Sequence, residues 1–222
     1  MSPVVTVHHL EMSRSTRVLW ALEELGVEYA MEVHPRHPKT MRAGPEIKAI
    51  HPVGRFPVVT IDGLVLAESG AILEHLAEQW GALAPTDPAD RVQYRYWMHF
   101  AEGSFMAPLL VAVIMKQLRT QVPFPISLIT GGIGKAVNKQ YTWPQLADLL
   151  TAVNGHLEQQ AYFAGADFSM ADIQMSYPCL AAVERVPKVR TRYPALLRWC
   201  TAVQDRPAFV RAVEVGGPLF IA

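Results

Sequence analysis

The chain is poor in cysteine, with only Cys179 and Cys200 among its 222 residues. Two thiols that form no CxxC pair cannot supply a disulfide framework or a dithiol redox centre. We therefore expect a reducing, cytoplasmic compartment. The sequence also has no basic start followed by an apolar core near its first residue, so no secretory signal is expected.

An excess of charge and a long apolar run are missing as well. Lys and Arg total 20 and balance 20 Asp and Glu, for a formal net charge of zero. This balance removes the electrostatic basis for a nucleic-acid or anionic-membrane partner. The longest uninterrupted apolar run, Phe105 to Met115, has 11 residues and includes Pro108. A bilayer span needs roughly 18, so no membrane partner is expected.

Hydrophobic periodicity in residues 1–80 predicts a small α/β domain. A helix stopped by Gly26 between two short strands indicates a parallel βαβ unit. Asp62-Gly63 between two β-branched runs predicts a two-residue hairpin. The predicted order is strand, helix, strand, strand, strand and helix, at residues 4–7, 18–25, 28–33, 58–61, 64–66 and 69–80.

Beyond a Pro- and Gly-containing linker at 81–88, the pattern is helical only. We expect helices at 89–119 (bent at Pro108), around 146–157, and within 169–184 and 194–215. The segment 121–141, which contains two prolines and GGIG, is expected to be a mobile loop. The fold class predicted is therefore an α/β domain followed by an all-α domain.

Histidine pairs are the metal-binding candidates. His8-His9 and His34-x-x-His37 carry the right side chains. Neither pair is joined by a cysteine or a carboxylate at ligand spacing. We therefore expect surface or loop histidines and no metal.

Three local features fall where an α/β domain would bind an anionic ligand. SRSTRVLW (13–20) lies at a strand-to-helix junction, where backbone N–H groups and the helix dipole favour an anion. Phe56-Pro57 immediately precedes a strand, and Glu68-Ser69 opens a helix. Each feature also has a purely structural interpretation, as a helix cap at Ser13, Ser15 or Ser69, or as a strand boundary.

The order and spacing of these features, with the two-domain pattern, resemble the cytosolic glutathione transferases. The resemblance covers essentially the whole chain and is densest at residues 8–29, 51–59, 66–73, 96–110 and 168–178. It is greatest to bacterial and fungal members of the serine-type, yeast Gtt1-like group. It implies a thioredoxin-like βαβ-ββα domain at 1–80, a linker at 81–88, and an all-α domain at 89–222 with a hydrophobic electrophile site.

The resemblance assigns glutathione binding to Arg55, Phe56, Pro57, Val58, Glu68 and Ser69. Pro57 would be a cis-proline, and the Val58 backbone would pair with the cysteinyl part of glutathione. The γ-glutamyl end would be held by Glu68 and Ser69, and the glycyl carboxylate would suit the Arg55 cation. Residues 36–42 could add a second cation, from Arg36, Lys39 or Arg42.

Such a transferase must form a thiolate near neutral pH, because the thiolate is the nucleophile. No tyrosine precedes Tyr29, and no cysteine precedes Cys179. The tyrosine-type and cysteine-type enzymes are thereby excluded, and the working thiol must come from glutathione. Ser13 is favoured as the hydroxyl donor, with Ser15 and Arg14 as alternatives and Thr16 as an outside candidate. Ser15 is the better N-cap of the two serines.

The electrophile is expected between the domains, against Phe100, Phe105, Met106 and Leu110. These side chains could equally be core residues at helical spacing. The resemblance also implies a homodimer, in which Glu102 would reach the amine of glutathione in the neighbouring subunit. Two alternatives to conjugation remain open: a glutathione-dependent peroxidase or dehalogenase of the same fold, and a non-catalytic binding protein.

Ser169 and Asp172 are expected to form a structural capping box.

Overall fold

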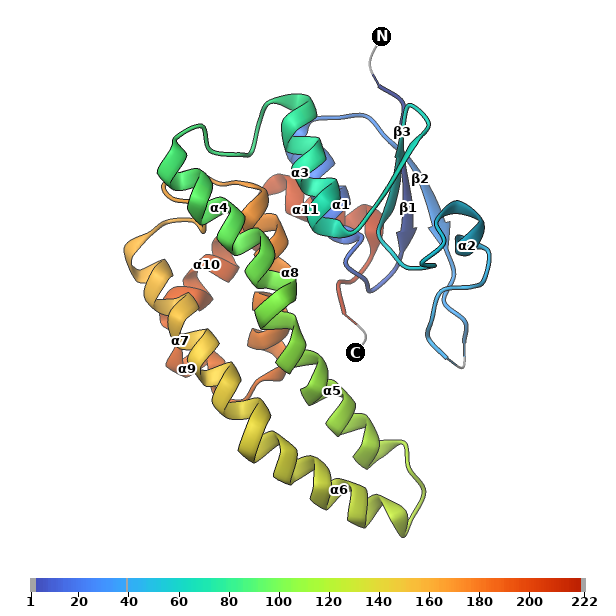
Figure 1. The fold of residues 1–222 in the computed structure, drawn as a ribbon, viewed down its shortest axis with the longest axis vertical. Coiled ribbons are helices and arrows are strands. Elements are labelled where there is room, and N and C mark those ends of the chain that lie inside the picture. The colour runs from blue at the N-terminus through green and yellow to red at the C-terminus, as the bar shows by residue number, and fades with distance from the viewer. Residues whose placement is uncertain (1–2, 39, 221–222) are drawn as a thin grey trace.

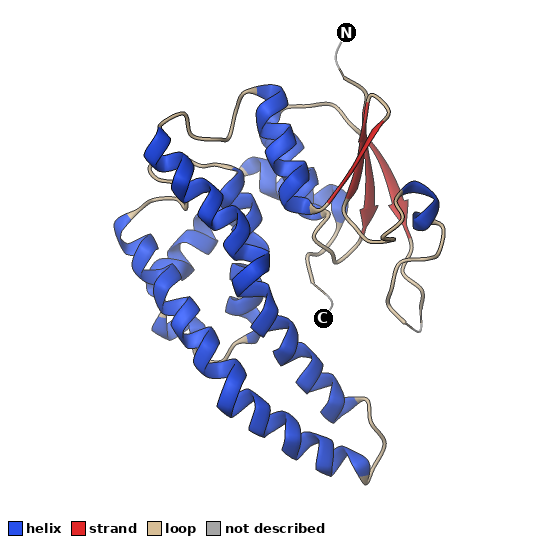
Figure 2. Ribbon diagram, viewed as in Figure 1, coloured by secondary structure: helices blue, strands red, loops and turns tan. Residues whose placement is uncertain are grey.

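The computed structural model describes residues 3–38 and 40–220. Figures 1 and 2 show a small sheet layered against helices, followed by a larger part built only of helices. The helices of the second part form an elongated bundle, and α5 and α6 extend away from the sheet as a paired arm. This is the thioredoxin-like domain and all-helical domain expected from the sequence.

The sheet contains β1 (Val5–Leu10), β2 (Ala30–His34), β3 (Val58–Ile61) and β4 (Leu64–Ala67) in the order β2-β1-β3-β4. β1 and β2 are parallel, whereas β1–β3 and β3–β4 are antiparallel. Asp62 and Gly63 have φ values of 49° and 87°, which a two-residue hairpin with both central residues left-handed requires. The predicted hairpin is therefore confirmed.

The two faces of the sheet have different partners. Val5 and Val7 of β1 pack into the large core shared with α1 (Thr16–Leu25) and α3 (Ser69–Trp80). On the other face, Leu10 and Val58 join a small cluster with α2 (Ile47–Ile50). Because side chains alternate along a strand, His8 shares the α2 face with Leu10.

The second part begins with α4 (Pro88–Phe100), which a short π-helical turn at Ala101–Phe105 joins to α5 (Met106–Thr120). A second π-helical turn at Asn138–Thr142 separates α6 from α7. The remaining helices are α6 (Ile126–Val137), α7 (Trp143–Gln159), α8 (Met170–Arg185), α9 (Val189–Arg192), α10 (Pro194–Gln204) and α11 (Pro207–Gly216).

Helix α8 lies at the centre of the helical part, and its start is fixed by the predicted capping box. The Ser169 side chain accepts from the Ala171 N–H, and the Asp172 carboxylate accepts from the Ser169 N–H. Asp172 also accepts from the Phe163 N–H and from Trp199 Nε1. Burial raises the pKa of Asp172 to about 6. This carboxylate is structural, as expected.

Helix α11 returns the end of the chain to the sheet domain. Phe209 packs edge-on against Trp20 of α1, with 5.0 Å between ring centroids. Arg206 makes a two-point ion pair with Glu24 of α1, and the Arg206 guanidinium lies over the Phe168 ring. The two domains therefore share one hydrophobic core, and α1 contacts residues of both domains.

The expectation of a mobile loop at 121–141 is wrong, because most of this segment is α6 and the turn that follows it. A Cβ at Gly134 would lie 3.2 Å from the Met115 carbonyl oxygen of α5. The glycines thus allow α6 to pack closely on α5, and this packing overrides their weak helix propensity. The sequence also suggested a bend at Pro108, and the irregular turn lies just before it, at Ala101–Phe105. Proline lacks the N–H that a regular helix would use there.

Within the described residues, one helical run is long and apolar enough to span a membrane by length and composition. It covers Pro88–Thr120, and its most apolar window has a mean hydropathy of 1.5 with one third of that window buried. Its buried side chains, Trp97 and Phe105 among them, belong to the core that includes α8. The apolar character of this run is thus partly that of a core helix.

Candidate active site

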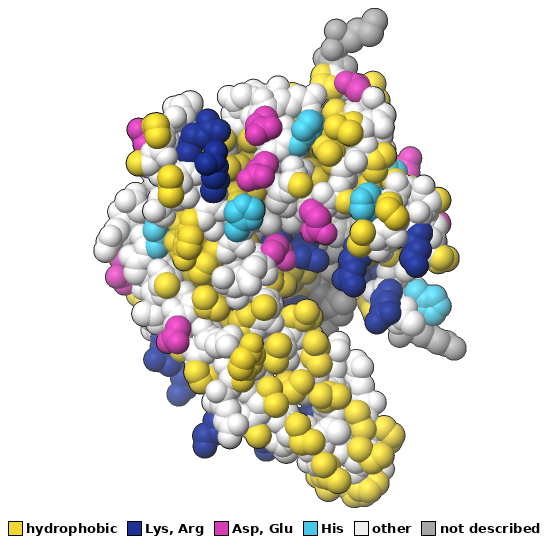
Figure 3. Space-filling view, viewed as in Figure 1, with side chains coloured by type: hydrophobic (Ala, Val, Ile, Leu, Met, Phe, Trp, Pro, Cys, Tyr) yellow, Lys and Arg dark blue, Asp and Glu magenta, His cyan; other side chains and the backbone are white. Residues whose placement is uncertain are grey.

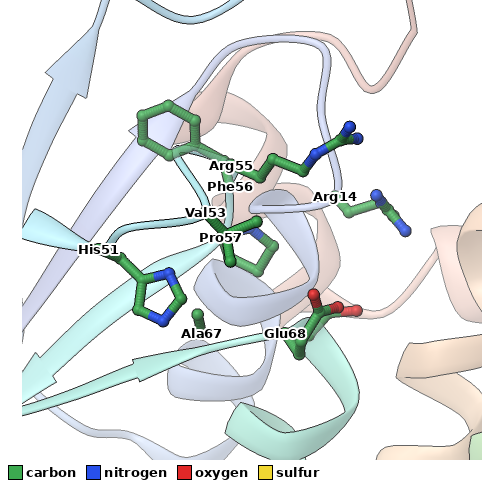
Figure 4. A pocket seen from close by; sticks show the side chains of 9 residues that line it. Arg14, His51, Val53, Arg55, Phe56, Pro57, Ala67 and Glu68 are labelled. Carbon is green, nitrogen blue, oxygen red and sulfur yellow. The ribbon is translucent and has the colours of Figure 1, made fainter. Parts of the chain in front are cut away.

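A pocket lies where the α1 loop, the loop before β3 and the start of α3 meet, and Figure 4 shows its lining residues. They are Arg14, His51, Val53, Arg55, Phe56, Pro57, Ala67, Glu68 and Ser69. The structure thus brings together five of the six predicted glutathione-binding residues. Val58, the sixth, follows Pro57 as the fully buried first residue of β3. The Phe56–Pro57 peptide bond is cis, as expected from the resemblance.

Glu68 and Ser69 form one wall of this pocket. Glu68 is exposed and has φ 70° and ψ 119°, a conformation that L-residues rarely adopt. Ser69 is the first residue of α3 and is buried, so the prediction that it caps this helix is wrong. Its Oγ instead accepts a hydrogen bond of 3.0 Å from Arg17 Nη1. That contact leaves the Ser69 hydroxyl proton available to a ligand.

Two arginines and one carboxylate set the charge beside the pocket. Glu102 pairs with Arg14, and its other oxygen lies 2.6 Å from Arg17 Nη1. Burial alone would raise the pKa of Glu102, but the Arg17 and Arg14 guanidinium groups outweigh it and hold that pKa below its usual value. Two cations against one anion leave a net positive charge here, which suits an anionic ligand or a thiolate.

Arg17 is a site residue that sequence reasoning missed. Its side chain is only 2% exposed. Its Nε and Nη2 atoms are buried and have no hydrogen-bond partner among the described residues, and its guanidinium lies 5.3 Å from the Tyr177 ring centroid. Burial lowers the pKa of Arg17. A buried cation that joins Ser69 to Glu102 fixes the start of α3 relative to the helical domain.

The two candidate serines have different surroundings. Ser15 is fully buried, and its Oγ lies 2.9 Å from His9 Nδ1, 3.1 Å from the Leu10 carbonyl oxygen and 3.2 Å from the Leu10 nitrogen. Ser15 occupies the N-cap position of α1, as predicted, but its side chain makes no capping hydrogen bond. Ser13 is partly exposed; its Oγ lies 2.8 Å from Ser15 Oγ and accepts from the Ser15 N–H at 3.2 Å.

His9 gives this hydroxyl chain a direction. Its Nε2 lies 2.7 Å from the Gly216 carbonyl oxygen, which can only accept, so Nε2 carries the proton. Burial lowers the pKa of His9, which keeps the ring neutral and makes Nδ1 an acceptor. The one proton of Ser15 is then directed at His9 Nδ1 and the Leu10 carbonyl oxygen, both of which accept. Ser13 must therefore be the donor in the Ser13–Ser15 contact. His9 is thus a second positioning residue that the sequence did not indicate.

Other predicted residues lie outside the pocket. Phe100 and Phe105 are buried in the shared core, whereas Met106 is partly buried and Leu110 is 55% exposed. Arg36 is committed to the backbone carbonyls of Glu11, Met12 and Met41. Arg42 is exposed, and Lys39 lies outside the described residues.

Neither cysteine can act as the nucleophile in this conformation, because both are buried. Burial raises the pKa of Cys200 to about 12 and that of Cys179 well above its usual value. A reacting thiolate must therefore come from a ligand.

Comparison with known families agrees with this geometry. A model of the glutathione S-transferase N-terminal domain matches residues 12–79, and one of the C-terminal domain matches residues 110–207. Glutathione S-transferase 3 of Schizosaccharomyces pombe is 35% identical over 214 residues, which cover 95% of this chain and 87% of the relative. Glutathione S-transferase 1 of Saccharomyces cerevisiae is 29% identical over 223 residues, which cover 96% of this chain and 95% of the relative.

Solved structures show the same similarity. A glutathione S-transferase from Actinobacillus pleuropneumoniae has a TM-score of 0.77 and 28% identity, and the match covers 97% of this chain and 94% of the other. A theta-class enzyme from Xanthomonas axonopodis pv. citri with glutathione bound has a TM-score of 0.72 and 26% identity. That match covers 98% of this chain and 99% of the other. The chain therefore belongs to the glutathione S-transferase family and is a glutathione transferase.

Proposed function

We propose that this enzyme binds glutathione in the pocket of Figure 4, ionises its thiol with the Ser13 hydroxyl, and conjugates the thiolate to small hydrophobic electrophiles. The observation that carries the choice of serine is the direction of the hydroxyl chain. The single proton of Ser15 is directed at His9 Nδ1 and the Leu10 carbonyl oxygen, and its oxygen is buried. Ser13 is partly exposed and has one proton that can turn from Ser15 to a ligand sulfur.

The same pocket supports a role for each part of glutathione. The Glu68 carboxylate accepts from the γ-glutamyl ammonium, while the Ser69 hydroxyl and the first N–H groups of α3 receive the α-carboxylate. Arg55 and Arg14 extend toward one side of the pocket, with Glu68 below them (Figure 4). Arg55 is the group for the glycyl carboxylate, because Arg14 is already paired with Glu102. The Val58 backbone pairs with the cysteinyl part.

The electrophile lies against the start of α5. Met106 and Leu110 are its candidate contacts, because Phe100 and Phe105 face the core.

We also propose a homodimer. Large apolar side chains remain exposed on the α5–α6 arm, and Figure 3 shows them gathered over its end. Contiguous exposed apolar surface of this kind is typical of a protein interface. Light scattering coupled to size exclusion measures the assembly.

The test is turnover of glutathione with a chlorodinitrobenzene-type electrophile by Ser13→Ala, with Thr16→Val as the matched control. Thr16 lies close to Ser13, and its hydroxyl donates only to the Ser13 carbonyl oxygen. We expect Ser13→Ala to lose most turnover at neutral pH while glutathione still binds, and Thr16→Val to retain turnover. Full turnover by Ser13→Ala would move the role to Ser15 or Arg14. Turnover only with hydroperoxides or haloalkanes would favour a peroxidase or dehalogenase, and no glutathione binding would indicate a scaffold.

A further inference from the structure

Three potential metal ligands meet on the sheet face opposite α1 and α3. In the parallel β1–β2 pair, His8 is aligned with Glu32, and Leu10 is aligned with His34. Strands β1 and β2 lie side by side (Figure 1). Because alternate residues point to the same face of a sheet, this register places His8, Glu32 and His34 on one face. β2 is an edge strand, so this cluster borders solvent. It is separate from the network of Ser13 and His9.

The spacing of the ligand atoms fits a tetrahedral metal ion. His8 Nδ1 lies 3.1 Å from Glu32 Oε2 and 3.3 Å from His34 Nε2, and one ligand atom from each of the three residues lies within 4.8 Å of the others. Metal–nitrogen bonds of about 2.0–2.1 Å at tetrahedral angles separate neighbouring ligand atoms by about 3.3–3.4 Å. Two of the three separations are therefore already close to those of a zinc site.

One hydrogen on His8 Nδ1 cannot make a full hydrogen bond in both of the short contacts of this atom. His8 Nδ1 faces both a carboxylate oxygen and the Nε2 of a second imidazole. If Nδ1 carries a proton, that one N–H is divided between two acceptors. If His34 carries the proton and donates to His8, the Glu32 carboxylate faces the ring without a hydrogen between them. A cation shared by all three lone pairs resolves this conflict.

The surroundings hold two of the ligands in place and leave the third accessible. The His8 side chain is 8% exposed, and its other ring nitrogen lies 3.5 Å from Thr60 Oγ1, so Nδ1 faces the cluster. The His34 ring packs on Phe56, with 5.0 Å between centroids. The Glu32 side chain is 60% exposed, which provides access from solvent. Three protein ligands leave a fourth position for water.

We propose that His8, Glu32 and His34 form a binding site for one divalent transition-metal ion of the Zn²⁺ type. Two imidazoles and one carboxylate are donors that zinc and neighbouring first-row ions accept. This site differs from the expectation of no metal at the two histidine pairs, because each pair contributes only one ligand and the carboxylate comes from the register of two strands. The proposal does not depend on the thiolate chemistry proposed for Ser13.

The test is titration of untagged, chelator-treated protein with Zn²⁺ in an isothermal calorimeter. Wild type should bind one equivalent. His34→Ala and Glu32→Gln, both changed at positions that are not buried, should each weaken binding at least about tenfold. His99→Ala is the matched control, because it removes an exposed histidine from α4; its affinity should equal that of wild type.

Thermal unfolding provides a second measurement that also checks folding. Zn²⁺ should raise the Tm of wild type and His99→Ala, and should raise that of His34→Ala and Glu32→Gln much less. The two ligand variants should match wild type in circular dichroism without metal. Equal Zn²⁺ affinity in wild type and His34→Ala would overturn the proposal. So would the absence of a one-equivalent site in wild type.

Discussion

Replacement of Ser13 by alanine removes the hydroxyl that we assign to the glutathione sulfur. In the free enzyme this hydroxyl donates to Ser15 Oγ over 2.8 Å, so ionisation of the bound thiol exchanges a neutral acceptor for a charged one. A hydrogen bond to a charged group is worth about 1.5–3 kcal/mol. Since about 1.4 kcal/mol corresponds to one pKa unit, the donor lowers the thiol pKa by about one to two units.

The consequence for catalysis follows from the ionised fraction. A thiol with a pKa of about 8.5 is only about 3% thiolate at pH 7, whereas one with a pKa of about 7 is about 50% thiolate. Ser13→Ala should therefore lower kcat/KM at pH 7 by roughly 10–30-fold. The loss should shrink as the pH rises above 8.5, because the thiol then ionises without help.

The assay is an ultraviolet difference titration of thiolate in glutathione-saturated enzyme, paired with the pH profile of kcat/KM. Ser13→Ala should move the apparent pKa up by about one to two units in both measurements. Thr16→Val and Ser13→Thr should stay close to wild type, the first because its hydroxyl serves only the backbone, the second because it restores a donor. A thiol pKa that is the same in Ser13→Ala and wild type would refute the reasoning.

Three further changes test the surroundings of the pocket. Glu68→Gly should raise the free energy of unfolding by about 1 kcal/mol, since glycine tolerates φ 70°, and should weaken glutathione binding; urea unfolding and calorimetry measure the two effects. Arg17→Met should lower the free energy of unfolding by about 1.5–3 kcal/mol, because its hydrogen bonds to Ser69 and Glu102 are lost while Glu102 keeps Arg14. The pKa of His9 is held below 6.5 by burial, so unfolding takes up a proton. The free energy of unfolding should therefore fall as the pH drops from about 6.5 toward the lower folded pKa, by at most about 1.4 kcal/mol per unit, and His9→Gln should reduce that slope.

Matched variants separate these effects from general damage. Glu68→Gln keeps a side chain in the rare conformation, so it should weaken glutathione binding without a gain in stability. Arg17→Lys keeps a cation and should be less destabilising than Arg17→Met. His99→Gln changes an exposed histidine and should leave the pH slope unchanged. The account of each residue would be contradicted by a destabilised Glu68→Gly, a fully stable Arg17→Met, or an unchanged slope in His9→Gln.

Local signals explain which parts of the fold could be predicted from the sequence. Gly26 ends α1 with φ 64°, Asp62-Gly63 forms the hairpin, and Ser169 with Asp172 starts α8. In each case the residue type acts on its immediate neighbours. The α6 helix could not be predicted in this way, because Gly131 and Gly134 are explained only by the approach of α5. Helix propensity loses to tertiary packing at such positions.

The candidate site was predictable where the family motif is contiguous, as at residues 55–57 and 68–69. The supporting residues were not, because their partners are distant in sequence. His9 bonds to a carbonyl 207 residues away, and Arg17 bonds to Ser69, 52 residues away. The side-chain partners of Ser15 were also not predicted, although His9 and Leu10 are near in sequence. A serine before a helix usually caps it, but here the imidazole and backbone of β1 provide better partners.

A crystal structure of the enzyme with glutathione bound tests the central claim most directly. We predict that the glutathione sulfur lies within hydrogen-bond distance of Ser13 Oγ, with the γ-glutamyl carboxylate at Ser69 and the start of α3. In that complex Ser15 should remain hydrogen-bonded to His9. A sulfur that contacts Arg14 or Ser15 instead, with Ser13 still directed at Ser15, would contradict the account.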